Sequence, residues 1–287
     1  MNAGESWRKR FKPADLSVPG REVAEDEYFN KDDGLIYCAK CNTKRQIAMD
    51  FGNFGVLQRL PVPCKCMKEE RERERRAMDE AQRRASADLN RSKGIADTIY
   101  HQYRFENDRG YNAQAMKMAK KYVAEWDEMR KNNRGLLLWG DTGTGKSFTA
   151  ACIANALIDK GARVMMTGLP WLIEELSGRY YKSKNEFIDS LNGYSLLIID
   201  DLGTEHSSAY SIEQIYRIID GRYRSNKPLI VTTNLTPDLM RAEQEVSYKR
   251  IYDRILAMSA PLRMNDVNIR QKKAAAKTRE LKKLLQA

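Results

Sequence analysis

Histidine is almost absent from this chain of 287 residues, which contains only His101 and His206. A metal centre built mainly from histidine is therefore excluded. The chain also has no apolar run near the roughly 18–20 residues that a membrane-spanning helix needs. The segment 1–10 is charged and has none of the apolar character of a signal peptide. We therefore expect no export and no membrane insertion, and we expect a cytoplasmic protein whose cysteines stay reduced.

Basic charge is what the chain has in excess, with 50 Lys and Arg against 39 Asp and Glu, a formal net charge of +11. This excess is unevenly placed. Residues 263–287 hold 8 basic and 2 acidic side chains, or +6, and residues 35–67 hold 5 and 1, or +4, whereas residues 94–262 are nearly neutral. A basic excess favours a polyanionic partner. The +6 of the last segment makes it the first candidate for that contact.

Short apolar runs separated by helical patterns follow one another from about residue 95. Expected strands are 136–139, 163–167, 196–199, 229–232 and 260–264, and expected helices include 147–160 and 170–179. Pro261 confines the last strand to a sheet edge or a strand start. Strands that alternate with helices predict an α/β fold, with a parallel sheet flanked by helices.

A glycine-rich segment lies between the first expected strand and its helix. The residues Gly140, Asp141, Thr142, Gly143, Thr144, Gly145, Lys146 and Ser147 match the pattern G-x-x-x-x-G-K-[ST]. Glycines let backbone N–H groups approach phosphates, and a helix N-terminus adds positive potential. Lys146 can bridge the β- and γ-phosphates, and the Ser147 hydroxyl can ligate Mg²⁺. This segment, with Phe148 next to it, predicts a nucleoside triphosphate site.

Acidic and amide side chains follow two further apolar strands. Asp200 and Asp201 end the strand 196–199, and Asn234 follows the strand 229–232. We expect Asp200 to hold Mg²⁺ through water and Asp201 to polarise an attacking water. Asn234 would orient that water, because ligands of open parallel sheets bind at the carboxyl ends of the strands. The second acid favours hydrolysis over phosphoryl transfer to a metabolite.

Arg250 and Arg254 lie one helical turn apart in the sequence Arg-Ile-Tyr-Asp-Arg. They are either part of a solvated helix face or an arginine finger for the nucleotide of a neighbouring subunit. The second interpretation would make the protein a self-associating ATPase.

These motifs together resemble AAA+ ATPases of the DnaC/DnaI/IstB branch, over residues 95–271. The resemblance rests on GDTGTGKS, LLIIDDLG, VTTNL, RIYDRI and the later Asn-Ile-Arg at 268–270. It implies that Asn234 is the sensor-1 residue, that Arg250 or Arg254 is the finger, and that Arg270 faces the nucleotide. It also implies that 171–185 contacts single-stranded DNA. That segment carries aromatic and cationic side chains suited to stacking and phosphate contact, namely Arg179, Tyr180, Tyr181, Lys182 and Lys184. Tyr180 and Tyr181 could instead pack against the core.

Four of the five cysteines form two close pairs, Cys38 with Cys41 and Cys64 with Cys66. Such pairs can deliver four thiolates to a tetrahedral Zn²⁺, and a segment with few large apolar residues would gain folding free energy from the metal. We therefore expect a zinc-binding module at 35–67, between a polar segment at 1–34 and a charged connecting helix at 68–94. The AAA+ domain would span 95–271, followed by a basic tail at 272–287.

The resemblance implies an ATP-dependent loader of a replicative DNA helicase, which binds ATP·Mg²⁺ and single-stranded DNA and hydrolyses ATP to release the helicase. Loaders of the DnaI type have an N-terminal zinc module that engages the helicase. The nearest alternative is an IstB-like transposition ATPase that binds DNA and recruits a transposase. A P-loop kinase of small molecules and a zinc adaptor with a purely structural nucleotide site are more distant alternatives.

Overall fold

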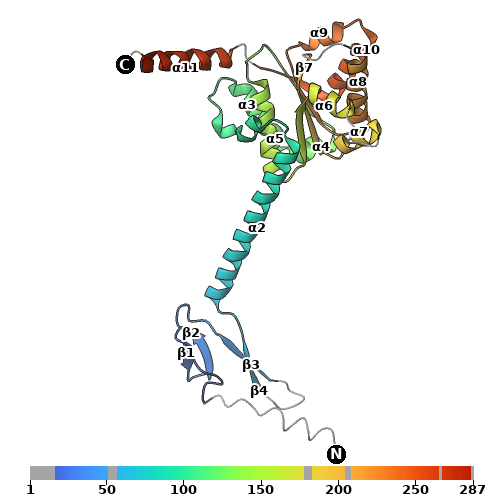
Figure 1. The fold of residues 1–287 in the computed structure, drawn as a ribbon. Helices are drawn as coiled ribbons and strands as arrows, with labels where there is room; N and C mark the ends of the chain where they lie inside the picture. Colours follow the sequence, from blue (N-terminus) through green and yellow to red (C-terminus); the bar gives the residue numbers. More distant parts are fainter. Residues whose placement is uncertain (1–16, 51–56, 178–182, 204–207, 265–266, 286–287) are drawn as a thin grey trace, which may run out of the picture. The chain divides into compact units, whose positions relative to one another are not determined.

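The computed structural model describes residues 17–50, 57–177, 183–203, 208–264 and 267–285 (Figure 1). The chain divides into two compact units, Met1–Gln82 and Arg83–Ala287. The boundary between the units lies within one long helix, Lys65–Gly94.

The first unit contains two antiparallel hairpins. Strand β1 (Glu27–Asn30) pairs with β2 (Leu35–Cys38), and β3 (Gln46–Asp50) pairs with β4 (Leu57–Pro61). Gly34 closes the first hairpin with a φ of 67°, a backbone conformation that glycine adopts without steric cost. The boundary that the sequence suggested between residues 34 and 35 therefore falls inside a hairpin. Residues 27–30 are paired with the strand that carries Cys38, and residues 31–34 form the turn between them.

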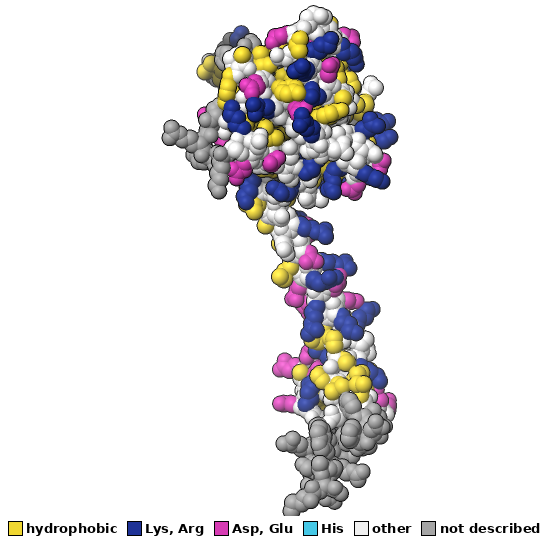
Figure 2. Space-filling view, turned by 90° about the vertical axis from the view of Figure 1, so that its right-hand side faces the viewer, with side chains coloured by type: hydrophobic (Ala, Val, Ile, Leu, Met, Phe, Trp, Pro, Cys, Tyr) yellow, Lys and Arg dark blue, Asp and Glu magenta, His cyan; other side chains and the backbone are white. Residues whose placement is uncertain are grey.

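Helix α2 (Lys65–Gly94) is 30 residues long and carries charges of both signs. Figure 2 shows basic and acidic side chains interspersed along it. Glu72 pairs with Arg75 and Arg76 one turn further on, at 2.9 Å in each case. Only Ala87, Arg91 and Gly94 of this helix are buried, so the solvated helix expected from the composition is present.

The second unit is built on a five-stranded sheet with the strand order β6-β7-β8-β5-β9. The strands are β5 (Gly135–Trp139), β6 (Val164–Gly168), β7 (Leu196–Leu202), β8 (Leu229–Thr233) and β9 (Ser259–Arg263). All pairings are parallel, so the predicted α/β fold with a parallel sheet is confirmed. Strand β9 pairs with β5 alone and is an edge strand, as Pro261 required.

Alternate residues of each strand pack on opposite faces of the sheet. Leu136 and Leu138 belong to one apolar cluster and Leu137 to the other. The first face is covered by α3 (Ala113–Ala124), α4 (Trp126–Lys131) and α5 (Lys146–Asp159). The second is covered by α6 (Leu169–Ser177), α7 (Lys184–Asn192), α8 (Ala209–Arg224), α9 (Pro237–Ala242) and α10 (Val246–Met258). Figure 1 shows α3 and α5 on one side of the sheet and α6, α8 and α10 on the other.

Three further elements lie outside these layers. Two short 3₁₀ helices, η1 (Thr98–Gln102) and η2 (Phe105–Asn107), precede α3, and α11 (Ile269–Leu285) follows β9. Among the described residues, no helix combines the length and the apolar character that a membrane crossing requires.

Candidate nucleotide site and cysteine cluster

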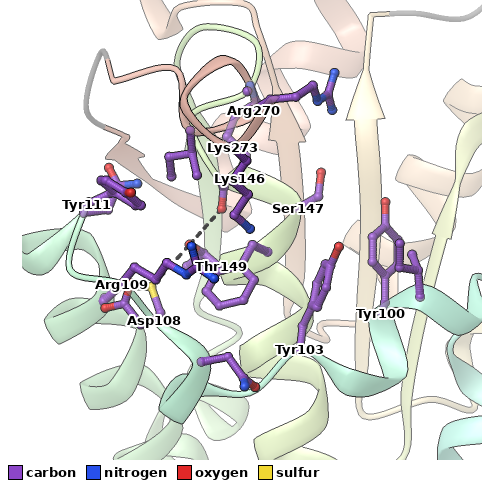
Figure 3. A pocket seen from close by; sticks show the side chains of 18 of the residues that line it. Tyr100, Tyr103, Asp108, Arg109, Tyr111, Lys146, Ser147, Thr149, Arg270 and Lys273 are labelled. Atoms are coloured by element: carbon purple, nitrogen blue, oxygen red, sulfur yellow. Dashed lines mark hydrogen bonds between the residues drawn. The ribbon is translucent and has the colours of Figure 1, made fainter. Parts of the chain in front are cut away.

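The carboxyl ends of three neighbouring strands, β7, β8 and β5, carry the side chains that the sequence singled out. The glycine-rich loop follows β5, Asp200 and Asp201 end β7, and Asn234 follows β8. A cavity of about 1220 Å³ opens at this edge and is lined by the loop, by η1, η2 and the residues after them, and by the first turn of α11. Figure 3 shows side chains from η1, from residues 108–111, from the start of α5 and from α11 around the same space. The fold therefore brings the predicted site residues together.

The glycine-rich loop is held in shape by its own backbone and by α3. Gly143 and Gly145 have φ values of 81° and 96°, which side chains rarely tolerate. The Thr144 hydroxyl donates to the Asp141 carbonyl at 2.7 Å, and the Asn112 amide donates to the Thr144 carbonyl at 2.7 Å. Helix α5 then begins at Lys146. These bonds keep the loop open toward the cavity, with the N-terminus of α5 at its base.

Lys146 is buried and lies at the centre of the site. Its ammonium donates to the carbonyls of Gly140 and Asp141 at 2.8 and 2.9 Å, and to Oδ1 of Asn234 at 2.7 Å. Burial lowers the pKa of Lys146, although the nearby Asp201 and Asp200 act in the opposite direction. The lysine and the amide, 88 residues apart in sequence, are therefore in direct contact.

Asp200 is nine-tenths buried, and both of its carboxylate oxygens accept hydrogen bonds. Thr232 donates to Oδ1 at 2.7 Å, and the Tyr100 hydroxyl donates to Oδ2 at 2.8 Å. Burial and the charge of Asp200 raise the pKa of Tyr100, which also interacts with Ser147. The carboxylate of Asp200 thus has a defined orientation, fixed by Thr232 and Tyr100.

Asp201 has a left-handed backbone, with a φ of 63°. The pairing of β7 with β8 shifts register between Ile199 and Leu202, and the Asp201 amide donates to the Thr232 hydroxyl at 2.8 Å. A bulge of this kind re-aims side chains at a strand end, and Asp201 lines the cavity. Desolvation and the neighbouring charge of Asp200 raise the pKa of Asp201.

The donors present fit a magnesium nucleotide. Mg²⁺ prefers oxygen ligands, and the Ser147 hydroxyl and the Asp200 carboxylate supply them. The glycine-rich loop, Lys146 and the start of α5 supply the N–H groups and the positive charge that phosphates require. Arg270 lines the same cavity, and the Ile269 amide donates to the Gly143 carbonyl at 2.8 Å, which attaches α11 to the loop.

Several residues of the cavity wall had no signal in the sequence pattern. They are Tyr100, Tyr103 and Arg109. The Tyr103 ring packs against Phe148, with centroids 5.2 Å apart. The segment 98–112 has no periodicity, and only its concentration of aromatic side chains before the first core helix could have indicated a ligand-facing role. Figure 3 shows Tyr100 and Tyr103 projecting toward the side of the cavity where Ser147 lies.

Arg250 and Arg254 have different surroundings in α10. The Arg254 guanidinium bonds Asp220 at 2.8 Å and the Tyr216 hydroxyl at 3.0 Å, and it lies 4.8 Å from the centroid of the Tyr216 ring. Arg250 is exposed, and its guanidinium makes no ion pair with any residue that the structure describes. Arg254 therefore stabilises its own chain, and Arg250 is the one directed to solvent.

The four cysteines expected to bind zinc lie together in the first unit. The sulfur atoms of Cys38, Cys41, Cys64 and Cys66 are all within 4.8 Å of one another, and no disulfide joins them. The hydrogen bond with Thr43 lowers the pKa of Cys41 to about 5, while the hydrogen bond with Cys64 and burial raise the pKa of Cys66 to about 12. Four thiolates around a tetrahedral Zn²⁺ are about 3.8 Å apart. The cluster therefore fits that ion.

Part of the expected DNA-contacting segment lies outside the described residues. Arg179, Tyr180, Tyr181 and Lys182 fall there, as does His206. Lys184 is the first residue of α7, and its ammonium lies 4.8 Å from the centroid of the Tyr210 ring.

Comparison with known proteins identifies relatives of the second unit. A family model described as "IstB-like ATP binding protein" matches residues 67–277. The replicative helicase loader DnaC of Escherichia coli is 29% identical over 191 residues, which cover 64% of this chain and 72% of that protein. The replicative helicase loader DnaI of Bacillus subtilis is 26% identical over 160 residues, so the match spans about half of each chain, 52% and 51%. A crystal structure of DnaI aligns with a TM-score of 0.50 and 28% identity, over 61% of this chain and all of that one.

Proposed function

The chain belongs to the family of IstB-like ATP-binding proteins, and on that premise we propose that it is an ATP-hydrolysing loader of a replicative DNA helicase. The observation that carries the proposal is the meeting of Lys146, Asp200 and Asn234 at the ends of three neighbouring strands. This site lies within residues 67–277, which the family model matches, and the chain is similar to proteins named replicative helicase loaders.

The residues of the site have distinct roles in the proposed reaction. The loop amides and Lys146 hold the β- and γ-phosphates, and Ser147 and Asp200 hold Mg²⁺. A bound Mg²⁺ neutralises charge on the phosphate oxygens. Asp201 and Asn234 orient the attacking water, and the raised pKa of Asp201 suits it to accept a proton.

Phosphate binding requires Lys146 to change partners. Its ammonium now bonds Oδ1 of Asn234 and two carbonyls. A phosphate oxygen is a stronger, charged acceptor than these neutral ones, so the lysine turns to it and frees the Asn234 amide for the water. Occupation of the phosphate site and positioning of the water are in this way linked through one hydrogen bond.

We also propose contacts with single-stranded DNA and with a second copy of this chain. Residues 270–285 of α11 are exposed. This helix carries seven basic side chains, Arg270, Lys272, Lys273, Lys277, Arg279, Lys282 and Lys283, against one acid, Glu280. We assign single-stranded DNA binding to α11 together with residues 171–185. Arg250, exposed on α10, is the finger directed at the nucleotide of a neighbouring copy.

The first unit has the role of gripping the helicase in this proposal. Its cysteine cluster binds Zn²⁺, and the domain organisation follows the sequence-based division, with the zinc module extended back to β1 because of the hairpin. The AAA+ domain at 95–271 and the tail after it remain as proposed from the sequence.

Co-purification with the hexameric replicative helicase of the same host tests the loader assignment. We expect a stable complex with the full chain, and slow ATP hydrolysis that single-stranded DNA or self-association accelerates. The variant K146A should lose hydrolysis and keep the helicase contact. Absence of any helicase complex, with hydrolysis intact, would contradict the loader assignment and leave the ATPase.

A second candidate follows from the description of the matched family, which refers to IstB. An insertion-sequence ATPase would bind duplex DNA and recruit a transposase. Retention of a transposase, and not of a helicase, by the immobilised chain distinguishes this candidate.

A further inference from the structure

Tyr100 occupies a position for which the reaction proposed above has no role. Its hydroxyl donates to Oδ2 of Asp200 at 2.8 Å. It therefore contacts one of the two side chains that we assign to Mg²⁺, and both Tyr100 and Ser147 line the same cavity. The residue lies in η1, 100 positions before Asp200, and its ring is half-buried in the cavity wall.

The backbone around Tyr100 is fixed by a buried amide. Asn155 in α5 is fully buried, and its Nδ2 donates to the carbonyls of Tyr100 and Tyr103, both at 2.8 Å. Its Oδ1 accepts from Nε of Arg91 at 2.8 Å. A buried amide with all three of these bonds made has one orientation, because turning it over would place a donor against the Arg91 N–H and the amide oxygen against two carbonyls.

Arg91 in turn is fixed by charge. It lies in the last turn of α2, only 6% of its surface is exposed, and its guanidinium pairs with Asp88 and Asp159. The end of α2 is anchored by close backbone packing, since a Cβ at Gly94 would lie 2.0 Å from the Val164 carbonyl oxygen. The chain of bonds thus runs from α2 through Asn155 and Tyr100 to Asp200.

We propose that Tyr100 is a positioning residue for the magnesium site, which orients the Asp200 carboxylate, and that Asn155 and Arg91 hold it in register. The proposal rests on the nucleotide site assigned above. Thr232 donates to Oδ1 and the Tyr100 hydroxyl donates to Oδ2, so the two bonds together fix the rotation of the carboxylate. Its remaining lone pairs would then be available to water bound to Mg²⁺. Partners that orient a ligand in this way typically change metal affinity by about 10–100-fold when they are removed.

The experiment compares Y100F with Y194F in the full-length protein. Both substitutions delete one phenol oxygen from the second unit. Tyr194 lies outside the cavity, beneath the Arg163 guanidinium, and the structure gives no hydrogen bond to its hydroxyl within the described residues. The affinity for a fluorescent ATP analogue is measured with Mg²⁺ and again in EDTA. We expect Y100F to bind roughly 10-fold more weakly with Mg²⁺ and equally well in EDTA. Y194F should match the wild type in both.

A double-mutant cycle shows whether Tyr100 acts through Asp200. The variant D200N should lose magnesium-dependent affinity, and Y100F should add little in that background, because coupled residues are not additive. R91K removes the Nε donor to Asn155 and keeps the positive charge. It should reproduce the effect of Y100F in the same direction, and more weakly.

The outcomes separate this inference from the function on which it rests. A wild-type protein whose affinity does not depend on Mg²⁺ overturns the magnesium site and the inference together. A wild type that responds to Mg²⁺ while Y100F behaves like Y194F overturns the inference alone. An equal loss by Y100F with Mg²⁺ and in EDTA also overturns it, since that result indicates general damage to the cavity.

Discussion

The two units of the chain are stabilised in different ways. In the second unit, two apolar clusters fill both faces of a five-stranded sheet, and residues such as Leu137, Ile198 and Val231 are fully buried. In the first unit, the buried apolar residues among those described are Leu35, Ile36, Cys38 and Cys64. Two of these four are cysteines of the sulfur cluster. The second unit therefore has a hydrophobic core, whereas the first unit has a cluster of four cysteines instead.

This difference would give an ion in the proposed zinc site a structural role in the first unit. Two-stranded hairpins are marginally stable by themselves in water. The four sulfur atoms bring together the end of β2, the turn that follows it and the start of α2. Binding of one ion would join them, whereas the second unit has no such requirement because its sheet is covered on both faces.

The largest expected effect is therefore that of metal removal, which should unfold the first unit and leave the second unit intact. We expect C41S to lose bound zinc and the fold of the first unit, because zinc binding to structural sites contributes on the order of 10 kcal/mol. Nucleotide binding by the second unit should stay unchanged. Zinc content by elemental analysis and protease cleavage within residues 17–64 provide the measurements.

The fifth cysteine supplies the control. Cys152 is buried in α5, where C152A preserves a small apolar side chain and should leave zinc content at the wild-type level. Full zinc content in C41S would show that the cluster is not the metal site.

The next largest effect tests the second unit alone. K146A should weaken ATP binding by about two orders of magnitude, because it removes the charged donor at the centre of the loop. The zinc content of K146A and the protease resistance of its first unit should equal those of the wild type. K160A, at the other end of α5, deletes the same charge from a lysine that bonds the Val123 carbonyl, and it should bind ATP normally. Equal losses in both variants would point to a loss of α5 stability instead.

Contiguous motifs could be located in the sequence, whereas contacts between residues that are distant in the sequence could not be predicted from it. The loop 140–147 and the acids at 200 and 201 are contiguous motifs next to apolar strands, so their positions follow from spacing. Tyr100 and Asn155 are distant from one another in sequence and carry no periodic signal. Their roles depend on the packing of η1 against α5. The first hairpin was missed for a similar reason, since an acidic segment gave no apolar alternation to indicate β1.

The basic helix α11 belongs to the second unit, and in the proposed function it contacts DNA through its charge. Truncation after Arg270 should weaken binding to single-stranded DNA and flatten its salt dependence, by about 0.7 in the log–log slope for each phosphate that the tail neutralises in the intact protein. Fluorescence anisotropy at several salt concentrations measures the slope. An unchanged slope would show that the tail only solubilises the chain.

The smallest effects distinguish the two arginines of α10. R254A should lower the stability of the second unit by about 1 kcal/mol, because it removes the partner of Asp220 and Tyr216. R250A should leave the melting temperature unchanged and reduce the protein-concentration-dependent part of ATP hydrolysis. Thermal denaturation and hydrolysis rates at rising protein concentration separate these outcomes. A stability loss in R250A would contradict its assignment as an exposed finger.

The left-handed backbone at Asp201 has a consequence for how this protein can be engineered. An L-residue with a side chain at a φ of 63° costs roughly 1 kcal/mol relative to glycine. Random mutagenesis followed by selection for heat resistance alone will therefore favour D201G, which relaxes the turn and deletes the acid that faces the cavity. Directed evolution of a more robust protein must include ATP turnover in the screen, because at this position the fold and the reaction favour different residues.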